Sequence, residues 1–455
     1  MPEQLQASKA ISLRIESVAR RHRIGEHAPR GVRTLSAGLL RIGTILAASG
    51  YPVRFLPLED LRQLLDQTPA SDAPTVVGFG AFCPTVPACA ALAEEVRKRF
   101  PGTRVALGGA HAAVAGDLTR RRYPVFHQVI PVFEEAAAGA LVGRLPQEFA
   151  RPLLELDYDL LPHPVAEYGL NLMTAMGCPF TCMYCQEAVA PWTHRPLDGG
   201  LADVMGQLPL RTPVHYCDSV LGGSPTRALQ VCKALAALGH GMLLSCDLRP
   251  EYVRPGLLEA LVAAGFVEIR VGLDSADEAV LAATGRSARP AQLPRALELV
   301  RELTELYVSV YLVTGLPGTT PRTLDQNLDV VHQLLSQGLA DQIRHNLYVP
   351  YPTDSCPSGH PDVRLLTDDW ARYDRHSYPV FELEGIEADR LWASFLAIEE
   401  AINVEWMRSL DLCVDDVCRV PMYPDSNGAM SLDRSPDPIL CEHYQPPAQH
   451  EEEIG

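Results

Sequence analysis

The sequence lacks the features that mark membrane-spanning, disulfide-rich and nucleic-acid-binding proteins. Residues 73–93 carry no charged side chain, but Gly78, Gly80, Pro84 and Pro87 interrupt them, which argues against a membrane helix. The 12 cysteines are too sparse in a chain of 455 residues to form a disulfide scaffold. The net charge of −17 argues against a broad nucleic-acid-binding surface, which has to be basic.

The N-terminal segment also lacks the apolar stretch of a secretory signal peptide, and acidic residues interrupt its arginines. We therefore expect a cytoplasmic protein with reduced thiols and with neither a membrane nor a nucleic acid as its partner. Hydrophobic residues make up 47% and charged residues 21% of the chain, which is the balance of a folded globular protein. At about 150 residues per domain, the length corresponds to roughly three domains.

Strand and helix patterns alternate over residues 1–144. Ser36 is placed to cap a helix that Gly50 would end. The predicted strands are residues 10–18, 53–58, 75–80, 103–109 and 124–130, and the other predicted helices are residues 58–65, 88–100 and 133–141. Strict alternation of this kind predicts an α/β fold with a doubly wound parallel sheet, which binds ligands beyond the carboxyl ends of its strands.

Two of these predicted strand ends carry candidate binding residues. Phe82 and Thr85 follow one strand, and Gly108, Gly109 and His111 follow the next. Paired glycines let a backbone approach a large flat ligand closely.

A proline-rich linker is predicted over residues 145–168, followed by a second alternating region over residues 169–365. Its predicted strands are residues 170–175, 213–217, 242–246, 267–273, 307–313 and 342–349, with helices such as residues 225–238, 255–264 and 290–306 between them. Six β/α units predict a partial TIM-type barrel with its chemistry at the carboxyl ends of the strands. Residues 366–455 are expected to form a small, mainly helical and aromatic-rich region with a helix over residues 388–409.

Three cysteines crowd into eight residues directly after the first predicted barrel strand. Cys178, Cys182 and Cys185 have the spacing C-x3-C-x2-C, and three thiolates on one loop can hold three irons of a cubane cluster while the fourth iron stays open. Three alternatives remain: unrelated buried cysteines, a zinc site that uses His194, and an electron-transfer cluster with a remote fourth cysteine.

The segment CPFTCMYC, with an aromatic residue before the third cysteine, resembles the signature of the radical S-adenosylmethionine (SAM) superfamily. Four later segments also resemble that superfamily: residues 214–235, 271–287, 311–323 and 347–355. The resemblance implies a [4Fe–4S] cluster held by the three cysteines, and SAM bound at the open iron. It further implies SAM contacts from Tyr184, Asp218, Asp274, Ser275, Gly315, Pro317 and Gly318.

The N-terminal half resembles the cobalamin-binding class of that superfamily. The segments AGLLRIGTILAASGYPVRFLPLEDL and VALGGAHAAVAGDL carry this resemblance. It implies that cobalamin (B12) binds near Phe82, Thr85, Gly108, Gly109 and His111. The chain has no D-x-H-x-x-G motif, so the usual lower axial histidine is missing, and IPVFEEAA replaces the family's acidic glycine segment.

The resemblance implies a cobalamin-dependent radical SAM methyltransferase acting on a carbon, or a phosphinate phosphorus, of a small molecule or peptide. A flavodoxin or ferredoxin-type reductant is the expected partner. Two alternatives stay open: radical chemistry other than methylation, such as cyclisation or ring contraction, and a non-catalytic iron–sulfur sensor. The other nine cysteines are interpreted as packing residues, and a second cluster built from Cys356, Cys413, Cys418 and Cys441 matches no known spacing.

Overall fold

The computed structural model describes most of the N-terminal half, the barrel and part of the C-terminal region. The described residues are 33–34, 36–56, 60–143, 156–165, 168–185, 192–197, 201–206, 208, 213–354, 363–408, 422–424 and 430–432. The predicted strand at residues 10–18 lies outside them, as do Cys356, Cys413, Cys418 and Cys441. The predicted domain boundaries near residues 144 and 168 stay predictions, since residues 144–155 and 166–167 are also outside.

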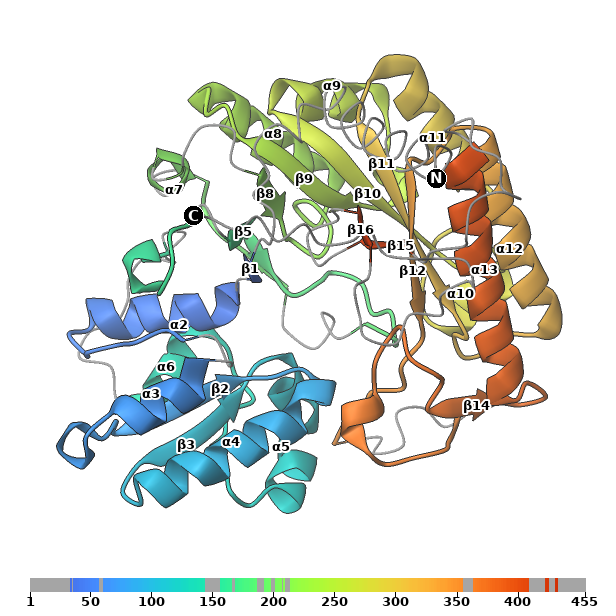
Figure 1. Ribbon diagram of the computed structural model, residues 1–455. Coiled ribbons are helices and arrows are strands. Elements are labelled where there is room, and N and C mark those ends of the chain that lie inside the picture. The colour runs from blue at the N-terminus through green and yellow to red at the C-terminus, as the bar shows by residue number, and fades with distance from the viewer. Residues whose placement is uncertain are drawn as a thin grey trace, which may run out of the picture.

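The N-terminal unit is a parallel sheet of three strands with helices on both faces (Figure 1). The strands are β2 (Val76–Gly80), β3 (Arg104–Gly108) and β4 (Gln128–Val129), in that order. The helices are α2 (Ala37–Ala48), α3 (Leu61–Gln67), α4 (Val86–Arg99), α5 (Ala110–Arg122) and α6 (Glu134–Val142). The central strand packs on both sides, with Val105 and Leu107 in one apolar cluster and Ala106 in another, which explains its unbroken apolar run.

Two local predictions for this unit need correction. Residues 53–56, the described part of the strand predicted at residues 53–58, form no strand. Their apolar side chains pack against the cores instead, Phe55 against the barrel cluster and Leu56 against the cluster that contains Phe79. Helix α2 begins after Ser36 and ends before Gly50, whose φ of 85° suits a glycine, but the Ser36 side chain makes no capping hydrogen bond.

The second unit is the predicted barrel of parallel strands, and all six predicted strands are confirmed. In order they are β5 (Tyr168–Leu172), β8 (Pro213–Tyr216), β9 (Leu243–Leu248), β10 (Phe266–Asp274), β11 (Tyr307–Thr314) and β12 (Gln342–Leu347). A short strand that the sequence did not predict, β1 (Arg33–Thr34), extends this sheet beside β5. The barrel helices are α7 (Leu201–Gly206), α8 (Pro225–Leu238), α9 (Pro255–Ala263), α10 (Glu278–Ala283), α11 (Gln292–Leu303) and α12 (Pro321–Ser336).

Small elements complete the fold around the long C-terminal helix α13 (Ala388–Arg408). The short antiparallel pairs are β6 (Ala175–Met176) with β7 (Thr193–His194), β13 (Val363–Leu365) with β14 (Phe381–Leu383), and β15 (Met422–Pro424) with β16 (Met430–Leu432). Single 3-10 turns lie at Ala70–Asp72, Cys83–Thr85, Tyr158–Leu160, Pro250–Tyr252 and Trp370–Arg372. Among the described helices, none is long and apolar enough to cross a membrane.

Side chains on the barrel strands alternate between an apolar outer layer and a polar lumen. On β11, Val308, Val310 and Leu312 belong to the core beneath the helices, while Ser309 and Tyr311 face the opposite side. The apolar core of the barrel therefore lies between the strands and the surrounding helices, and polar side chains line the lumen.

The C-terminal segment joins the two units in one apolar cluster. Phe79 and Leu107 of the N-terminal sheet share this cluster with Trp370 and Phe381 of the C-terminal segment and with Leu347 at the end of β12. In Figure 1 the C-terminal segment, in orange, lies below the barrel and beside the N-terminal unit, in blue.

Two polar links join the N-terminal unit to the barrel unit. Glu134, directly after β4, forms an ion pair with Arg195, which follows β7 near the end of β5. The Asp354 carboxylate, in the loop after β12, accepts hydrogen bonds from the backbone N–H groups of Asp117 (3.0 Å) and Leu118 (2.8 Å) in α5. Each link joins a helix of the N-terminal unit to a loop of the barrel unit.

The link to α5 has a local cause. The backbone of Ala115 departs from helical geometry (φ −132°, ψ 36°), so the helix restarts and exposes a new set of unpaired N–H groups. Asp354 accepts two of these, as an N-cap side chain does, although it lies more than 200 residues further along the chain.

We predict that Asp354→Ala lowers the free energy of unfolding by about 1 kcal/mol, as expected for the loss of an N-cap. Urea unfolding followed by circular dichroism measures the change. Asp368→Ala is the matched control, because the Asp368 side chain is 90% exposed and forms only a surface ion pair with Arg122. Equal stability of the two variants would contradict the capping role.

Candidate active site at the carboxyl ends of the barrel strands

The three cysteines lie on one loop that begins at the end of β6. Gly177 starts the loop with φ 73°, and its carbonyl accepts a hydrogen bond from the Ser219 hydroxyl (3.0 Å). Cys182 is buried, whereas Cys178 and Cys185 are partly exposed. The Cys185 N–H donates to the Cys182 carbonyl (3.0 Å), so the second half of the loop forms a tight turn.

Backbone contacts dock this loop against the turn after α10. The Met183 N–H donates to the Thr284 carbonyl (3.0 Å). A Cβ at Gly285 would lie 3.1 Å from the Thr181 carbonyl oxygen, so only glycine lets the two segments come this close. The loop is thus held by an element about 100 residues away in sequence.

The sequence analysis missed Arg249, which positions the first half of the cysteine loop. Its guanidinium carbon lies 3.9 Å from the centre of the Phe180 ring, a cation–π contact. Arg249 is 1% exposed, donates to the Ser287 hydroxyl (3.2 Å) and pairs with Glu251. Because arginine is common on surfaces, nothing in the sequence alone marked this residue as buried.

A second cluster ties the cysteine loop to the end of β10. The Tyr184 hydroxyl donates to Oδ2 of Asp274 (2.7 Å), and Nε of Arg286 lies 2.6 Å from the same oxygen. Arg286 also donates to the Gly272 carbonyl (2.7 Å). The structure therefore brings the predicted residues Tyr184 and Asp274 together and adds Arg286, which the sequence analysis did not identify.

The backbone of Asp274 takes an uncommon conformation that aims its carboxylate at this cluster. Its φ is 63°, at a bulge where the register of β10 against β11 shifts. Aspartate tolerates this left-handed region better than most residues. The strand thus ends in a turn that carries an acid into the mouth of the barrel.

Charge and burial act together in this cluster. Burial, and then the Asp274 carboxylate, raise the pKa of Tyr184, so its hydroxyl remains a donor. Burial alone would lower the pKa of Arg286, but Asp274, Tyr184 and Cys182 together raise it above its usual range. Arg286 is therefore a permanent positive charge beside the Cys182 thiol.

Asp218 is buried and holds the backbone that precedes the cysteine loop. Its Oδ1 accepts from the N–H groups of Thr174 (2.7 Å) and Ala175 (2.8 Å), and its Oδ2 accepts from the Thr174 hydroxyl (3.0 Å) and the Gly222 N–H (3.3 Å). Burial raises the pKa of Asp218, while these hydrogen bonds oppose that rise. All four hydrogen bonds join Asp218 to groups of the protein itself. Asp218 therefore stabilises the backbone before the cysteine loop, and its contact with SAM stays a prediction.

The remaining predicted SAM residues also lie at strand ends. Ser275 is buried, and its hydroxyl accepts from the Asp277 N–H (3.2 Å), as in a local turn. Gly315 and Pro317 are buried and Gly318 is exposed, and a Cβ at Gly315 would lie 3.1 Å from the Phe381 ring. The C-terminal segment therefore covers one side of Gly315, and the predicted contacts of these residues with SAM stay predictions.

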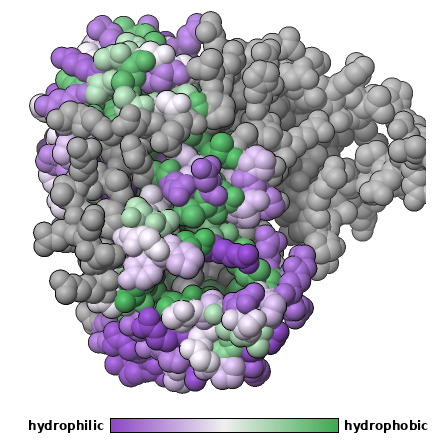
Figure 2. All heavy atoms as spheres, turned by 90° about the vertical axis from the view of Figure 1, so that its left-hand side faces the viewer, coloured by the Kyte–Doolittle hydropathy of each residue, from purple (hydrophilic) through white to green (hydrophobic). Residues whose placement is uncertain are grey.

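The N-terminal sheet presents apolar side chains at its carboxyl edge. Phe82 is 62% exposed after β2, and Val132 is 41% exposed after β4. Thr85 accepts from the Phe82 N–H (3.1 Å) and so fixes the turn that displays the phenyl ring. In Figure 2, green apolar atoms gather at the hollow above the hydrophilic lower part of the molecule, which is the N-terminal unit.

The absence of a side chain has a different consequence at each of the two predicted glycines of this edge. Gly109 has φ 92°, and a Cβ there would lie 2.9 Å from backbone atoms of Ala81, so the turn itself requires glycine. At Gly108 a Cβ would have no contact closer than 4.0 Å. The lack of a side chain at Gly108 is not needed for packing and leaves that edge of the sheet open.

His111 does not lie on this edge. It is fully buried, contacts the Thr119 hydroxyl (2.9 Å) and packs edge-on against Trp370, with 4.8 Å between ring centres. Burial lowers its pKa to about 4, so the imidazole is neutral near pH 7. The predicted corrin contact of His111 is therefore not supported, because the C-terminal segment packs over its ring.

Of the five other described cysteines, Cys83, Cys89, Cys232 and Cys246 are buried as predicted for packing residues, whereas Cys217 is partly exposed. Cys83, Cys89 and Cys232 are buried, and burial raises the pKa of their thiols to about 12, 11 and 12. His194, the candidate fourth ligand of the zinc alternative, is exposed on β7. Among the described residues, no three His, Cys, Asp or Glu side chains converge on a single-ion site.

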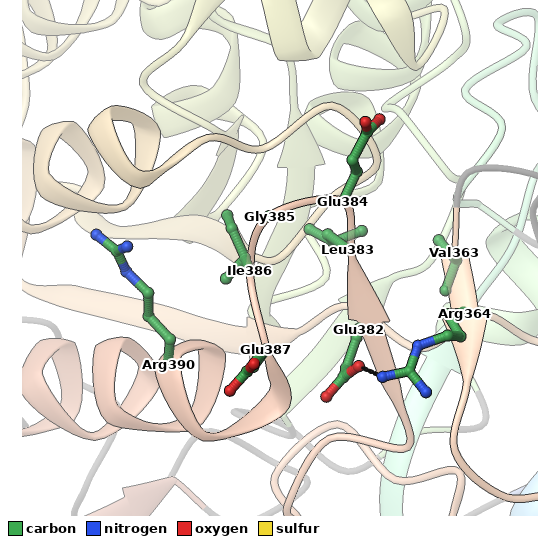
Figure 3. Close-up of a pocket in the computed structure, with 9 residues that line it drawn as sticks. All are labelled: Val363, Arg364, Glu382, Leu383, Glu384, Gly385, Ile386, Glu387 and Arg390. Carbon is green, nitrogen blue, oxygen red and sulfur yellow. Dashed lines mark hydrogen bonds and ion pairs between the residues drawn. The ribbon is translucent and has the colours of Figure 1, made fainter.

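A shallow hollow of about 850 Å³ lies elsewhere, on the hairpin of β13 and β14 and the start of α13 (Figure 3). Arg364 pairs with Glu382 at its rim, while Glu384, Glu387 and Arg390 extend from the loop and the helix. It contains no cysteine or histidine, so the chemistry suggested by the cysteine loop has no counterpart there.

Comparison with known proteins agrees with the site geometry. Residues 172–331 match the family model of the radical SAM superfamily. The chain therefore carries a radical SAM barrel. It is a radical SAM enzyme, which implies a [4Fe–4S] cluster and SAM as cofactors.

Three similar proteins place the whole architecture in context. An uncharacterized methyltransferase of Pyrococcus horikoshii, PH0819, is 20% identical over 357 residues, which are 70% of this chain and 76% of that protein. The radical SAM methyltransferase TsrM from Kitasatospora setae, solved with cobalamin and a [4Fe–4S] cluster, has a TM-score of 0.62 at 17% identity and covers 80% of this chain and 88% of its own. The cobalamin-dependent radical enzyme OxsB, solved with aqua-cobalamin, has a TM-score of 0.51 at 14% identity over 67% of this chain and 50% of its own. These likenesses establish a shared fold of an N-terminal parallel sheet and a barrel.

We predict that Arg286→Gln destabilises the radical SAM enzyme by about 3 kcal/mol, because it leaves the buried Asp274 carboxylate without its cation. Chemical unfolding followed by circular dichroism measures the loss. Arg295→Gln is the control, because the Arg295 side chain is 73% exposed and its surface ion pair contributes little. Similar stability of the two variants would show that the pair does not hold the loop.

A buried charge network also closes the lumen of the barrel at mid-depth. Glu268 pairs with Arg270 (3.1 Å) and Arg344 (3.1 Å), and the Ser309 hydroxyl donates to the same carboxylate (2.8 Å). Burial would raise the pKa of Glu268, but the two guanidiniums lower it from 4.5 to about 2. The carboxylate is therefore charged near pH 7.

We predict a pH-dependent stability contribution from Glu268. A lowered pKa in the folded state means that the contribution is complete above the unfolded pKa of 4.5 and is lost as the pH falls toward 2. The difference in unfolding free energy between the wild type and Glu268→Gln should shrink by about 2 kcal/mol between about pH 5.5 and 3. Glu298→Gln, on the exposed face of α11, should show no such change; a constant difference for Glu268→Gln would contradict the assignment.

Proposed function

We propose that this radical SAM enzyme is a cobalamin-dependent methyltransferase. The observation that carries the proposal is the contact between the two units: α6, which follows β4, is joined to the loop after β7 through Glu134–Arg195. Helix α5, which follows β3, is joined to the loop after β12 through Asp354. The edge of the N-terminal sheet, where a flat cofactor would bind, is thereby held near the barrel mouth and its cysteine loop. The folds of TsrM and OxsB support the same arrangement.

The residues present fit an iron–sulfur cluster. Three thiols lie on one short loop whose turns are held by Gly177, Thr284 and the Asp274–Arg286 pair. The Arg286 guanidinium lies beside Cys182 and supplies a positive charge next to the thiol-bearing loop. A cluster bound there, together with SAM, supplies one-electron reductive cleavage of the sulfonium, with the electron from a flavodoxin or ferredoxin-type partner.

The carboxyl edge of the N-terminal sheet fits a large flat ligand. Phe82 and Val132 offer exposed apolar contacts, and Gly108 leaves the backbone open for close approach. His111 is neutral and covered by Trp370, so it is unsuited to bind as a lower axial ligand. We therefore propose that cobalamin binds base-off without a protein histidine.

The chain's own contribution to catalysis is positioning and the exclusion of water. Arg249 and Arg286 hold the cysteine loop, and the C-terminal segment covers the loop after β11 through Phe381. We propose a small-molecule or peptide substrate that is methylated on carbon, with a phosphinate phosphorus as the alternative acceptor.

We predict that protein reconstituted anaerobically with iron, sulfide and cobalamin shows the visible spectrum of base-off cobalamin and cleaves SAM when reduced. Separate Cys→Ala changes at residues 178, 182 and 185 should abolish the cluster absorption and SAM cleavage but retain cobalamin. Cys89→Ala, in α4, is the control and should retain all three signals.

Three results separate the alternatives. Absence of bound cobalamin would overturn the proposal. A product heavier by one methylene unit per turnover identifies methylation, whereas other mass changes identify the alternative radical chemistry. Cluster formation without any SAM cleavage over a substrate panel indicates a sensor.

A further inference from the structure

The outer face of the cysteine loop is exposed and carries no charge. Thr181 is exposed, and Met183 is 54% exposed although its side chain is large and apolar. Between them Cys182 is buried, and on the other side of Thr181 the Phe180 ring lies against Arg249. Side chains thus alternate along the loop: those that anchor it point inward, and the others form its outer face.

The end of α10 and the turn after it extend this outer face. The Met183 N–H donates to the Thr284 carbonyl (3.0 Å), and Gly285 lies against the backbone of Thr181, so the two segments are in direct contact. We call their exposed residues the loop face: Pro179, Thr181, Met183, Ala282, Ala283 and Gly285. Methionine is enriched at protein–protein interfaces, because its flexible apolar side chain adapts to a partner.

Two exposed arginines without an acidic partner lie beside the loop face. Arg289 is four residues beyond Gly285, and Arg254 donates to a backbone carbonyl (3.3 Å); neither forms an ion pair within the part of the chain that the structure describes. The Arg249 guanidinium donates to the Ser287 hydroxyl (3.2 Å), and the 3-10 turn after Arg249 lies next to α11. These contacts bring the segments that carry Arg254 and Arg289 together.

Acidic side chains are scarce around the loop face. Residues 178–185 and 279–297 contain no aspartate or glutamate, and Glu278 lies at the opposite end of α10. The two acids close to these segments, Asp274 and Glu251, each pair with a buried arginine. In a chain with a net charge of −17, this surface departs from the average, because its unpaired charges are positive.

We propose that the loop face is the docking site of an acidic electron-carrier protein of the flavodoxin or ferredoxin type. Electron transfer slows steeply with distance, so the donor has to approach the exposed side of the loop that bears the thiols. The acidic remainder of the chain repels such a carrier, whereas Arg254 and Arg289 attract it at this point.

The inference rests on the proposed function, in which such a carrier supplies the electron. The carrier gives up one electron and the cluster takes up one, and no bond forms or breaks at the interface. Arg254 and Arg289 position the partner and do not touch the substrate or the cofactors.

The test measures how fast flavodoxin hydroquinone reduces the full chain reconstituted with iron and sulfide, from the loss of cluster absorption in stopped flow. The double variant Arg254→Glu with Arg289→Glu should be reduced roughly tenfold more slowly, because it repels the carrier. Rising salt should slow the wild type but not this variant. Arg254→Lys with Arg289→Lys keeps both charges and should keep the wild-type rate.

Photoreduction with 5-deazariboflavin, which is small and uncharged, separates docking from damage to the cluster. It needs no docking surface, so it should give the wild type and the glutamate variant the same electron paramagnetic resonance signal. Lys98→Glu with Arg121→Glu is the matched control, because it makes the same change of charge on exposed residues of α4 and α5 in the N-terminal unit. It should leave the flavodoxin rate unchanged.

Equal flavodoxin rates for the two glutamate variants would overturn the inference. A wild type that 5-deazariboflavin reduces but flavodoxin and ferredoxin do not would overturn it as well. The spectrum of bound cobalamin is recorded on each protein. Equal rates with base-off cobalamin bound sink only the docking site, whereas slow reduction confined to the Arg254 and Arg289 variant without bound cobalamin sinks only the proposed function.

Discussion

The ion pair between Asp274 and Arg286 is the interaction on which the cysteine loop depends. Asp274 reaches it through a left-handed backbone at a bulge of β10, and Tyr184, between the second and third cysteines, donates to the same carboxylate. The cysteine loop itself contains few apolar anchors, so its shape comes from these polar contacts and from the close approach at Gly285. A buried pair of this kind adds little net stability but selects one arrangement, because either partner alone is costly to bury.

Polar contacts also hold the two units together. Both sheets end in loops that leave backbone donors and charges without partners, and the units satisfy these groups by meeting edge to edge. Asp354 caps the restarted helix α5, and Glu134 is placed between Arg41 and Arg195. Burial, followed by the like charge of Arg195, lowers the pKa of Arg41 to about 10, which shows how closely the two guanidiniums are held. An apolar cluster that includes Trp370 and Phe381 then seals the junction.

The barrel lumen differs from a packed core in its chemistry. The apolar side chains of the strands face outward to the helices, so the inside is left to His215, Asp247, Glu268, Arg270 and Arg344. Such groups are tolerated inside only when they pair with one another, and most of them do.

The sequence by itself determined the order of elements, the barrel strands and the three cysteines, because strand alternation and motif spacing are local properties of the chain. It also indicated Tyr184 and Asp274 through a resemblance. The tertiary structure alone decided that Arg249 and Arg286 hold the cysteine loop and that His111 is buried beneath Trp370, because those contacts join residues far apart in sequence. Residues 53–56, the described part of the strand predicted at residues 53–58, form none, since pairing depends on a neighbouring strand that no local pattern records.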